Sequence, residues 1–400
     1  MTRILITYGW CRTAYVAAES LARAGFEVFA CDAARVNMTR ASRRVSGFDR
    51  VPDPFQDPER YVEALARVVE RRRIDILFPA HEDAVAIRRY EACLPRGLTV
   101  ACPPLADLER ALDKADIVEA ARSAGVNAPE TLIPTSFREV EPLAERLGLP
   151  VVVKTRHGNS GKGVVLAKSA AEARDRYEDL VGTLGLSPPH WPLLQRFVPG
   201  GVCGACFLAD RGRVLACFAE RYLRCKESSF GTSVLREPYD APRLVDMTAT
   251  MARALQWTGI GHFDFVVSPD GRDAWLIEMN PRLWGALNLA IANGFDFPRG
   301  YMGLLTDGRP PADAFRPVDA PVKSLWIVGE LIAGMAEFRR GDLAAPLKSL
   351  GRIVAPGRDC VYDDFRWSDP LPLVAALAYY GAGFIRSGGQ VNPVRREMLQ

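Results

Sequence analysis

The sequence predicts an α/β fold with two or three domains. Over residues 1–103, short apolar runs alternate with helical patterns, as they do in βαβ units built on a parallel sheet. Two later pairs of strand-like runs each enclose a turn. The first pair (residues 151–167) has a glycine-rich turn, and the second pair (residues 263–280) carries acidic side chains on its strands. With 48% apolar and 25% charged residues in 400, the chain can build sizeable cores.

Composition limits the classes of protein that fit. No run approaches the roughly 20 apolar residues that span a bilayer, so we expect no transmembrane segment. The first ten residues lack a signal-peptide pattern, and the nine cysteines lack framework spacing, so a reducing cytoplasm is expected. A net charge of +3 argues against a dedicated nucleic-acid binder.

The N-terminal segment is the first candidate for ligand contact. We expect strands at 3–7, 27–32, 74–80 and 98–102, with helices near 14–24 and 58–72. The first turn contains Gly9 alone and lacks G-x-G-x-x-G, which argues against dinucleotide binding. Ligands of open parallel sheets bind beyond the carboxyl ends of the strands, which predicts a substrate rim of Tyr8, Trp10, Arg12, Asp32, His81, Glu82 and Asp83. A purely structural lobe with polar loops is the alternative.

A glycine-rich turn lies between two predicted strands at 151–155 and 164–167. Its sequence, RHGNSGKG, places glycines at 158, 161 and 163, which frees the backbone to turn amide groups toward an anion. It is not a Walker A loop, because Arg156 occupies a required glycine position and a strand follows instead of a helix. One helix is expected before this turn, from Leu105 to about Gly125.

The acidic hairpin predicts a metal site. Side chains alternate along a strand, so His262, Asp264 and Val266 share one face, and Leu276, Glu278 and Asn280 share a face of the second strand. Pairing of the two strands then brings Asp264 close to Glu278 and Asn280. Hard oxygen ligands of this kind suit Mg²⁺ when substrate phosphates complete its shell. Solvated acids on an exposed hairpin are the alternative.

These motifs together resemble the ATP-grasp superfamily. The metal-binding end of that family has an acidic residue, a short hairpin and then E-x-N-x-R, which corresponds here to Asp264, Glu278, Asn280 and Arg282. The phrase from Asp113-Lys114 to Gly125-Val126 and Pro129 resembles the family's entry motif, and strand–loop–strand resembles its phosphate-covering flap. The resemblance covers roughly residues 1–306 and is nearest to the carbamoyl-phosphate-synthetase-like branch of carboxylate–amine ligases.

The resemblance implies domains and site residues. It implies an N-terminal Rossmann-like domain (1–103), an ATP-grasp domain (104–309, with a small lid at about 128–198 and a large lobe at about 199–309) and a mostly helical C-terminal extension (310–400). The implied metal ligands are Asp264, Glu278 and Asn280, and the implied catalytic residues are Lys154 and Arg282. ATP would be held by Lys114, Lys154, Ser160, Gly161, Lys162, Gly163, Gln195, Arg196, Phe197 and Val198. In the hinge, Leu194, Phe197 and Val198 would sandwich adenine, while backbone groups of Arg196 and Val198 bond its edge.

A basic run follows the hinge. Arg221, Arg224, Lys226 and Arg236 are expected in a Gly/Ser-rich loop that faces an anionic substrate, together with Arg282, His81 and Glu82, although such runs are usually solvated. In the C-terminal segment we expect a helix near 325–337 and another over 371–385. The second is too short to span a bilayer and is expected to lie buried against 325–338; docking to a partner or a membrane is the alternative.

The function implied by the resemblance is ATP- and Mg²⁺-dependent ligation, with Mn²⁺ as a substitute metal. A carboxylate is phosphorylated to an acyl phosphate, and an amine then displaces phosphate to give an amide and ADP. Partners are therefore small-molecule carboxylates and amines, with self-association through the N-terminal or C-terminal region left open. The alternatives are a carboxylase-like enzyme that phosphorylates bicarbonate, or a nucleotide-binding regulator without turnover.

Overall fold

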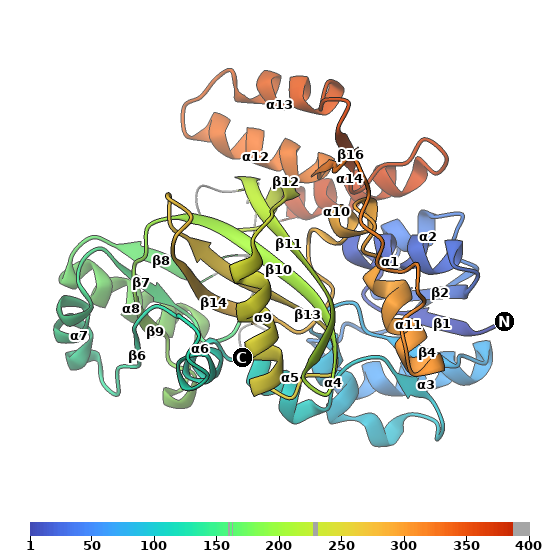
Figure 1. Cartoon of the computed structure of the whole chain (residues 1–400), viewed down its shortest axis with the longest axis horizontal. Helices are drawn as coiled ribbons and strands as arrows, with labels where there is room; N and C mark the ends of the chain where they lie inside the picture. The colour runs from blue at the N-terminus through green and yellow to red at the C-terminus, as the bar shows by residue number, and fades with distance from the viewer. Residues whose placement is uncertain (159–160, 162, 227–230, 387–400) are drawn as a thin grey trace.

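Three β-sheets organise the chain in the computed structural model, which describes residues 1–158, 161, 163–226 and 231–386. A five-stranded sheet from the N-terminal segment lies at one end, and a small four-stranded sheet lies at the other (Figure 1). A seven-stranded sheet runs between them and carries most of the long strands. The α/β class predicted from the sequence is confirmed.

The N-terminal sheet is parallel, with strand order β3-β2-β1-β4-β5. Its strands are β1 (Arg3–Ile6), β2 (Glu27–Asp32), β3 (Gly47–Arg50), β4 (Ile76–Phe78) and β5 (Thr99–Val100). The crossover helices are α1 (Arg12–Arg23), α2 (Met38–Ala41), α3 (Pro58–Arg72) and α4 (Asp83–Arg89). Strand β3 and helix α2 were not predicted, because four-residue elements carry too little periodicity to be recognised.

The small sheet is antiparallel and lies in the segment predicted to form the lid. Its order is β6-β9-β7-β8, with β6 (Thr131–Leu132), β7 (Val151–Lys154), β8 (Val164–Ala167) and β9 (Leu193–Arg196). Helices α7 (Val140–Leu147) and α8 (Ala170–Leu184) pack on one of its faces and bury Val153, Tyr177 and Leu194. Helix α8 begins sharply, because Ser169 accepts a hydrogen bond from the Glu172 amide and Glu172 accepts one from the Lys168 amide.

The central sheet has the order β14-β13-β10-β11-β12-β15-β16. Its strands are β10 (Gly201–Asp210), β11 (Arg213–Cys225), β12 (Ser233–Pro238), β13 (Gly259–Val267), β14 (Ala274–Asn280), β15 (Lys323–Leu325) and β16 (Cys360–Tyr362). Helix α9 (Pro242–Ala254) and α6 (Lys114–Ser123) cover one face, burying Phe207, Phe263 and Phe265. The long helix predicted over 105–125 is wrong, because it is broken into α5 (Leu105–Leu112) and α6. Asp113 lies between them with extended backbone, and its side chain caps α6.

The opposite face of the central sheet packs against the N-terminal segment. Helices α10 (Leu287–Ala292) and α11 (Phe297–Asp307) contact α1, and one core joins Ile4 and Leu21 to Trp284 and Phe297. The polar contact of Ser20 Oγ with Asp296 Oδ1 (2.6 Å) adds to this interface. The N-terminal sheet is thereby fixed with its carboxyl-end loops facing the acidic hairpin.

The C-terminal segment continues the central sheet. Strand β15 pairs with β12, and β16 pairs with β15; neither strand was predicted. Helices α12 (Ile327–Arg339), α13 (Ala345–Val354) and α14 (Leu371–Arg386) complete it (Figure 1). We therefore propose that residues 310–386 belong structurally with the segment that precedes them, instead of forming a separate extension.

Helix α14 is buried on one face only. The Tyr380 ring contacts Trp326, at the start of α12, but the Tyr379 ring stacks on Trp10 (centroids 5.0 Å apart) and the helix also packs against α2. Leu371, Val374 and Ile385 remain largely exposed. Burial against 325–338 is thus confirmed in part, and the N-terminal segment supplies the other half of the contact. Within the described residues no helix is long and apolar enough to cross a membrane.

Deleting residues 370–400 should lower the melting temperature by several degrees. The deletion uncovers Trp10 and the apolar surface beneath Ala375 and Ala376, and exposure of buried apolar area destabilises a fold. Differential scanning fluorimetry of the full-length and truncated proteins measures the effect. An unchanged melting temperature would mean that α14 contributes no stability.

Candidate active site

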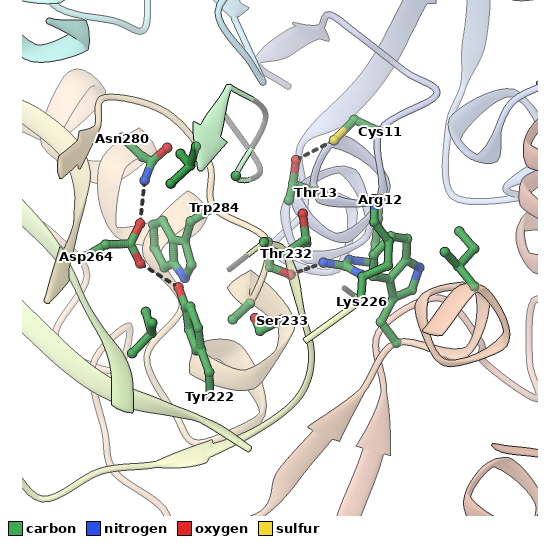
Figure 2. Close-up of a pocket in the computed structure, with 18 of the residues that line it drawn as sticks. Cys11, Arg12, Thr13, Tyr222, Lys226, Thr232, Ser233, Asp264, Asn280 and Trp284 are labelled. Carbon is green, nitrogen blue, oxygen red and sulfur yellow. Dashed lines mark hydrogen bonds between the residues drawn. The ribbon is translucent and has the colours of Figure 1, made fainter. Parts of the chain in front are cut away.

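The acidic hairpin is the centre of the site. Its register pairs Asp264 with Glu278 and His262 with Asn280, so these side chains lie together on one sheet face. Asp264 Oδ2 accepts a hydrogen bond from Asn280 Nδ2 (2.9 Å), and Asp264 Oδ1 accepts one from the Tyr222 hydroxyl (2.8 Å), as Figure 2 shows. The predicted proximity of Asp264, Glu278 and Asn280 is therefore present.

A β-bulge alters the faces of the second strand. Phe265 pairs with Leu276, which leaves Ile277 as an extra residue between that pair and Asp264–Glu278. Leu276 is consequently buried in the core with Phe265, and Glu278 faces the opposite side. The prediction that Leu276 and Glu278 share a face is wrong, since strict alternation does not hold across a bulge.

Two lysines approach Glu278. Lys154, the last residue of β7, donates from Nζ to the Ile277 carbonyl (3.2 Å), so the bulge supplies an acceptor for the lysine. Lys114, the first residue of α6, donates from Nζ to the Gly158 carbonyl (2.7 Å), and its Nζ lies 3.6 Å from Glu278 Oε2. Both lysines are about 5% exposed. The site therefore brings two ammonium groups to one carboxylate.

Burial and neighbouring charges set the protonation of these groups. Burial, reinforced by the charge of Lys114 and opposed by that of Glu278, lowers the pKa of Lys154 to about 7. Burial also raises the pKa of Asp264 to about 6, with His262 opposing and Glu278 reinforcing the rise. Burial would raise the pKa of Glu278 too, but Lys114 and Lys154 outweigh it and the pKa lies below its usual value. Binding of a cation or an anion would therefore change the charge state of these groups.

The glycine-rich turn joins β7 to β8 beside the lysines. Gly158, Gly161 and Gly163 all have positive φ (104°, 71° and 73°), a backbone conformation that glycine adopts without steric cost. A Cβ at Gly163 would also lie 2.7 Å from Thr155 Oγ1. Gly161 lines the cavity described below. Ser160 and Lys162, predicted to bind ATP, lie outside the described residues.

The hinge strand β9 contributes one wall. Gln195, Arg196, Phe197 and Val198 line the cavity as predicted, but Leu194 does not, because it is buried in the lid core. Gln195 Nε2 donates to Thr131 Oγ1 (2.8 Å). The Arg196 backbone N–H donates to the Glu130 carbonyl (2.8 Å), so this N–H is used within the small sheet, and the contact of Arg196 with the adenine edge stays a prediction.

A cavity of about 620 Å³ connects these features. It runs from the lid and hinge past the acidic hairpin to the N-terminal loops and the C-terminal helices. Its volume is in the range of small-molecule sites. In the described residues no three His, Cys, Asp or Glu side chains form a metal cluster, so any cation here would rely on two carboxylates, an amide and ligand oxygens.

Comparison with known proteins agrees with this geometry. A family model described as an ATP-grasp domain matches residues 111–286. The chain contains an ATP-grasp domain. It is 28% identical over 266 residues to a carbamoyl phosphate synthase large chain of Rubrobacter xylanophilus, covering 61% of this chain and 25% of that one. It is 24% identical over 339 residues to the N-terminal section of that enzyme from Aquifex aeolicus, covering 76% and 60% respectively. The matches thus span less than two thirds of these relatives' own length.

Solved structures share the ATP-grasp fold. The β,γ-ATP complex of a biotin carboxylase from Campylobacter jejuni superposes with a TM-score of 0.65 at 15% identity, covering 78% of this chain and 73% of that one. An L-amino acid ligase from Bacillus licheniformis superposes with a TM-score of 0.58 at 17% identity, covering 80% and 78%. Both carboxylases and ligases therefore occur among the structural neighbours.

The N-terminal loops meet the ATP-grasp domain through Arg282. Its guanidinium group donates to Asn280 Oδ1 (2.9 Å) and pairs with Glu82 Oε1 (3.3 Å), which joins the acidic hairpin to the N-terminal lobe. Of the predicted rim, Tyr8, Trp10, Arg12 and His81 line the cavity, and Asp32 lines a neighbouring one. Asp83 does not belong to the rim, because it is buried and accepts hydrogen bonds from Thr7 and Tyr61.

The basic run does not form the predicted loop. Arg221 and Arg224 lie on β11 and Arg236 lies on β12, and none of the three lines the cavity. Arg221 pairs with Glu237, Arg224 with Glu330 and Glu337, and the fully buried Arg236 with Asp363. Lys226 alone among these four cations lines the cavity. The arginines are thus committed to ion pairs within the protein.

Two further side chains support Asp264. His262 is buried, with Nδ1 3.8 Å from Asp264 Oδ2 and Nε2 3.4 Å from Glu220 Oε1. Burial would lower the pKa of His262, but Asp264 and Glu220 outweigh it and raise the pKa. His262 lies on the strand face predicted from the sequence, although it was not predicted as a site residue. Tyr222 was not predicted either, because nothing in the sequence links Tyr222 to Asp264.

Proposed function

We propose that the protein is an ATP- and Mg²⁺-dependent ligase that activates a carboxylate and couples it to an amine. The observation that carries this proposal is the convergence of Lys114 and Lys154 on Glu278, beside Asp264 and Asn280. Ammonium groups next to the half-buried Glu278 and the buried Asp264 suit a triphosphate whose charge is shared with a divalent cation. The ATP-grasp domain makes ATP the expected phosphoryl donor.

The donor set fits a magnesium ion. Glu278 and Asp264 oxygens would hold it with Asn280 Oδ1, which has a second lone pair besides the one that accepts from Arg282. The rise in the Asp264 pKa reflects a charge that a cation would stabilise. Mg²⁺ bound there would neutralise negative charge on the β- and γ-phosphates, and Mn²⁺ could replace it. Lys154 and Lys114 would bind the phosphates, and Arg282 would orient the carboxylate oxygen.

The proposed reaction has two steps. A substrate carboxylate oxygen attacks the γ-phosphorus, the bond to the β,γ-bridging oxygen breaks, and ADP leaves with that electron pair. The amine nitrogen then attacks the acyl carbon, phosphate leaves, and the nitrogen loses a proton to give the amide. The chain's own groups contribute position and electrostatics in this scheme, with no protein nucleophile.

Activation of bicarbonate is the second candidate, because carbamoyl phosphate synthase and biotin carboxylase are among the similar proteins. The cavity favours a larger acid. Beyond the acidic hairpin it continues along apolar side chains of α12 and α14, which a bicarbonate ion would not contact.

Oxygen-18 transfer tests the proposal. The protein is incubated with ATP, Mg²⁺ and pooled ¹⁸O-labelled carboxylic and amino acids, and released phosphate is analysed by mass spectrometry. We expect one labelled oxygen per phosphate, because the attacking carboxylate oxygen leaves with the phosphoryl group. Hydroxylamine, added in place of the amine, should trap a hydroxamate.

The same experiment, repeated with ¹⁸O-labelled bicarbonate, separates the alternatives. Label that arrives in phosphate from bicarbonate alone would support the carboxylase-like reaction. ATP binding without release of ADP under any condition would support the regulatory alternative. Either result would reject the carboxylate–amine assignment.

A further inference from the structure

The end of the cavity away from the lid has an apolar wall. Helices α12 and α14 supply large side chains to it, and Trp10 closes it from the N-terminal segment. Met335 and Leu377 line this wall, and each is 41% exposed because it faces the cavity instead of a packed core. The wall is continuous with the acidic hairpin, and its main side chains are Val328, Leu331, Ile332, Met335, Leu377 and Phe384.

A buried cation lies at the inner edge of this wall. Arg12 is 8% exposed, stands 4.1 Å above the Trp326 ring, donates to the Gly285 carbonyl and has Nε 3.6 Å from Asp363 Oδ2. Its Nη1 has no hydrogen-bond partner among the described residues, although the side chain lines the cavity. An unpaired buried guanidinium N–H is costly, which indicates that a ligand oxygen completes it.

Arg12 lies apart from the residues that are proposed to bind the metal ion. Figure 2 shows Arg12 and Lys226 on one side of the cavity, with Asp264 and Asn280 on the other. A molecule between them would meet cations at one end and the acidic hairpin at the other. Its remaining atoms would lie against α12 and α14.

We propose that the substrate is an amphipathic carboxylic acid, with its carboxylate lying between Arg12 and the acidic hairpin and an aromatic or long aliphatic body against the α12–α14 wall. This proposal rests on the proposed function for the fate of the carboxylate, but the binding it describes can be measured without turnover. Amino acids with large apolar side chains and simple apolar acids share this chemistry, and the experiment distinguishes them.

Calorimetric titration of the full-length protein, with Mg²⁺ and a non-hydrolysable ATP analogue present, tests the proposal. The ligands are straight-chain acids from propionate to octanoate, then 3-phenylpropionate and its amine counterpart 3-phenylpropylamine. We expect affinity to rise roughly fourfold per methylene until the wall is filled. The amine should not bind measurably, because Arg12 and Lys226 select an anion. Norleucine and phenylalanine show whether an α-amino group improves binding.

Met335→Asp tests the wall itself. Met335 is partly exposed, so the substitution should leave the fold intact while adding an unpaired charge where the apolar body lies. We expect affinity for 3-phenylpropionate to fall at least about tenfold, with propionate unaffected. Leu347→Asp is the matched control, because Leu347 is 75% exposed on α13 and does not line the cavity; its binding should equal wild type.

The outcomes separate this inference from the proposed function. Tight binding of apolar acids without ADP release would support the inference and reject the ligase proposal. ADP release driven equally by small or doubly charged acids, with Met335→Asp unchanged, would reject the inference alone. Loss of self-association in Met335→Asp without any change in acid binding would also overturn it, since the wall would then cover a second copy.

Discussion

Glu278→Gln is expected to abolish turnover while leaving the fold intact. The amide preserves the volume of the side chain but removes the charge that holds Lys114 and Lys154 and that a divalent cation would need. We expect kcat to fall by roughly 10³-fold or more, measured as substrate-dependent ADP release. Nucleotide binding should persist, because both lysines remain to contact phosphate.

Asp273→Asn is the matched control for this variant. It also converts an acid to an amide beside the hairpin, but the Asp273 side chain is 57% exposed and does not line the cavity. Its activity should equal that of the wild type. Glu278→Gln with full activity at ordinary Mg²⁺ concentrations would remove the metal site from the proposed mechanism.

The acidic hairpin could be predicted from the sequence because its information is local. Strand periodicity and one turn bring Asp264 within a few positions of Glu278 and Asn280 along a paired ladder. The bulge at Ile277 could not be predicted in this way, because an extra residue leaves no trace in the alternation of five or six side chains. As a consequence of the bulge, Leu276 lies on the face opposite to the one predicted.

The prediction made from the basic run was wrong for the opposite reason, because the information it needed is not local. Arg224 finds Glu330 and Glu337 more than a hundred residues later, and Arg236 finds Asp363 at a similar separation. A run of cations in a sequence does not reveal distant carboxylates that will neutralise it. The same limit hid the contribution of α12 and α14, whose side chains reach the cavity only because β15 and β16 extend the central sheet.

Replacement of Lys154 is expected to have the second large effect on activity. Replacing it with Ala should raise KM for ATP about tenfold and lower kcat about 100-fold, because its ammonium would contact phosphate in both the ground and transition states. Lys154→Met is the volume-preserving companion, and Lys168→Ala is the control, since Lys168 lies exposed in the same lid. Unchanged ATP kinetics in both Lys154 variants would mean that the glycine-rich hairpin is an ordinary turn.

Because the pKa of Lys154 is lowered, its contact with phosphate should be measurable as proton uptake when MgATP binds. With a pKa of about 7 in the unliganded protein, the side chain is mostly neutral at pH 8 and mostly charged at pH 6. A bound phosphate favours the charged form, so MgATP binding should take up about one proton at pH 8 and much less at pH 6. Asp264, with a pKa of about 6, is already ionised at pH 8 and does not obscure the uptake there. Calorimetry in two buffers of different ionisation enthalpy measures the protons directly. Uptake at pH 8 that persists in Lys154→Met would show that another group, and not this lysine, responds to the phosphate.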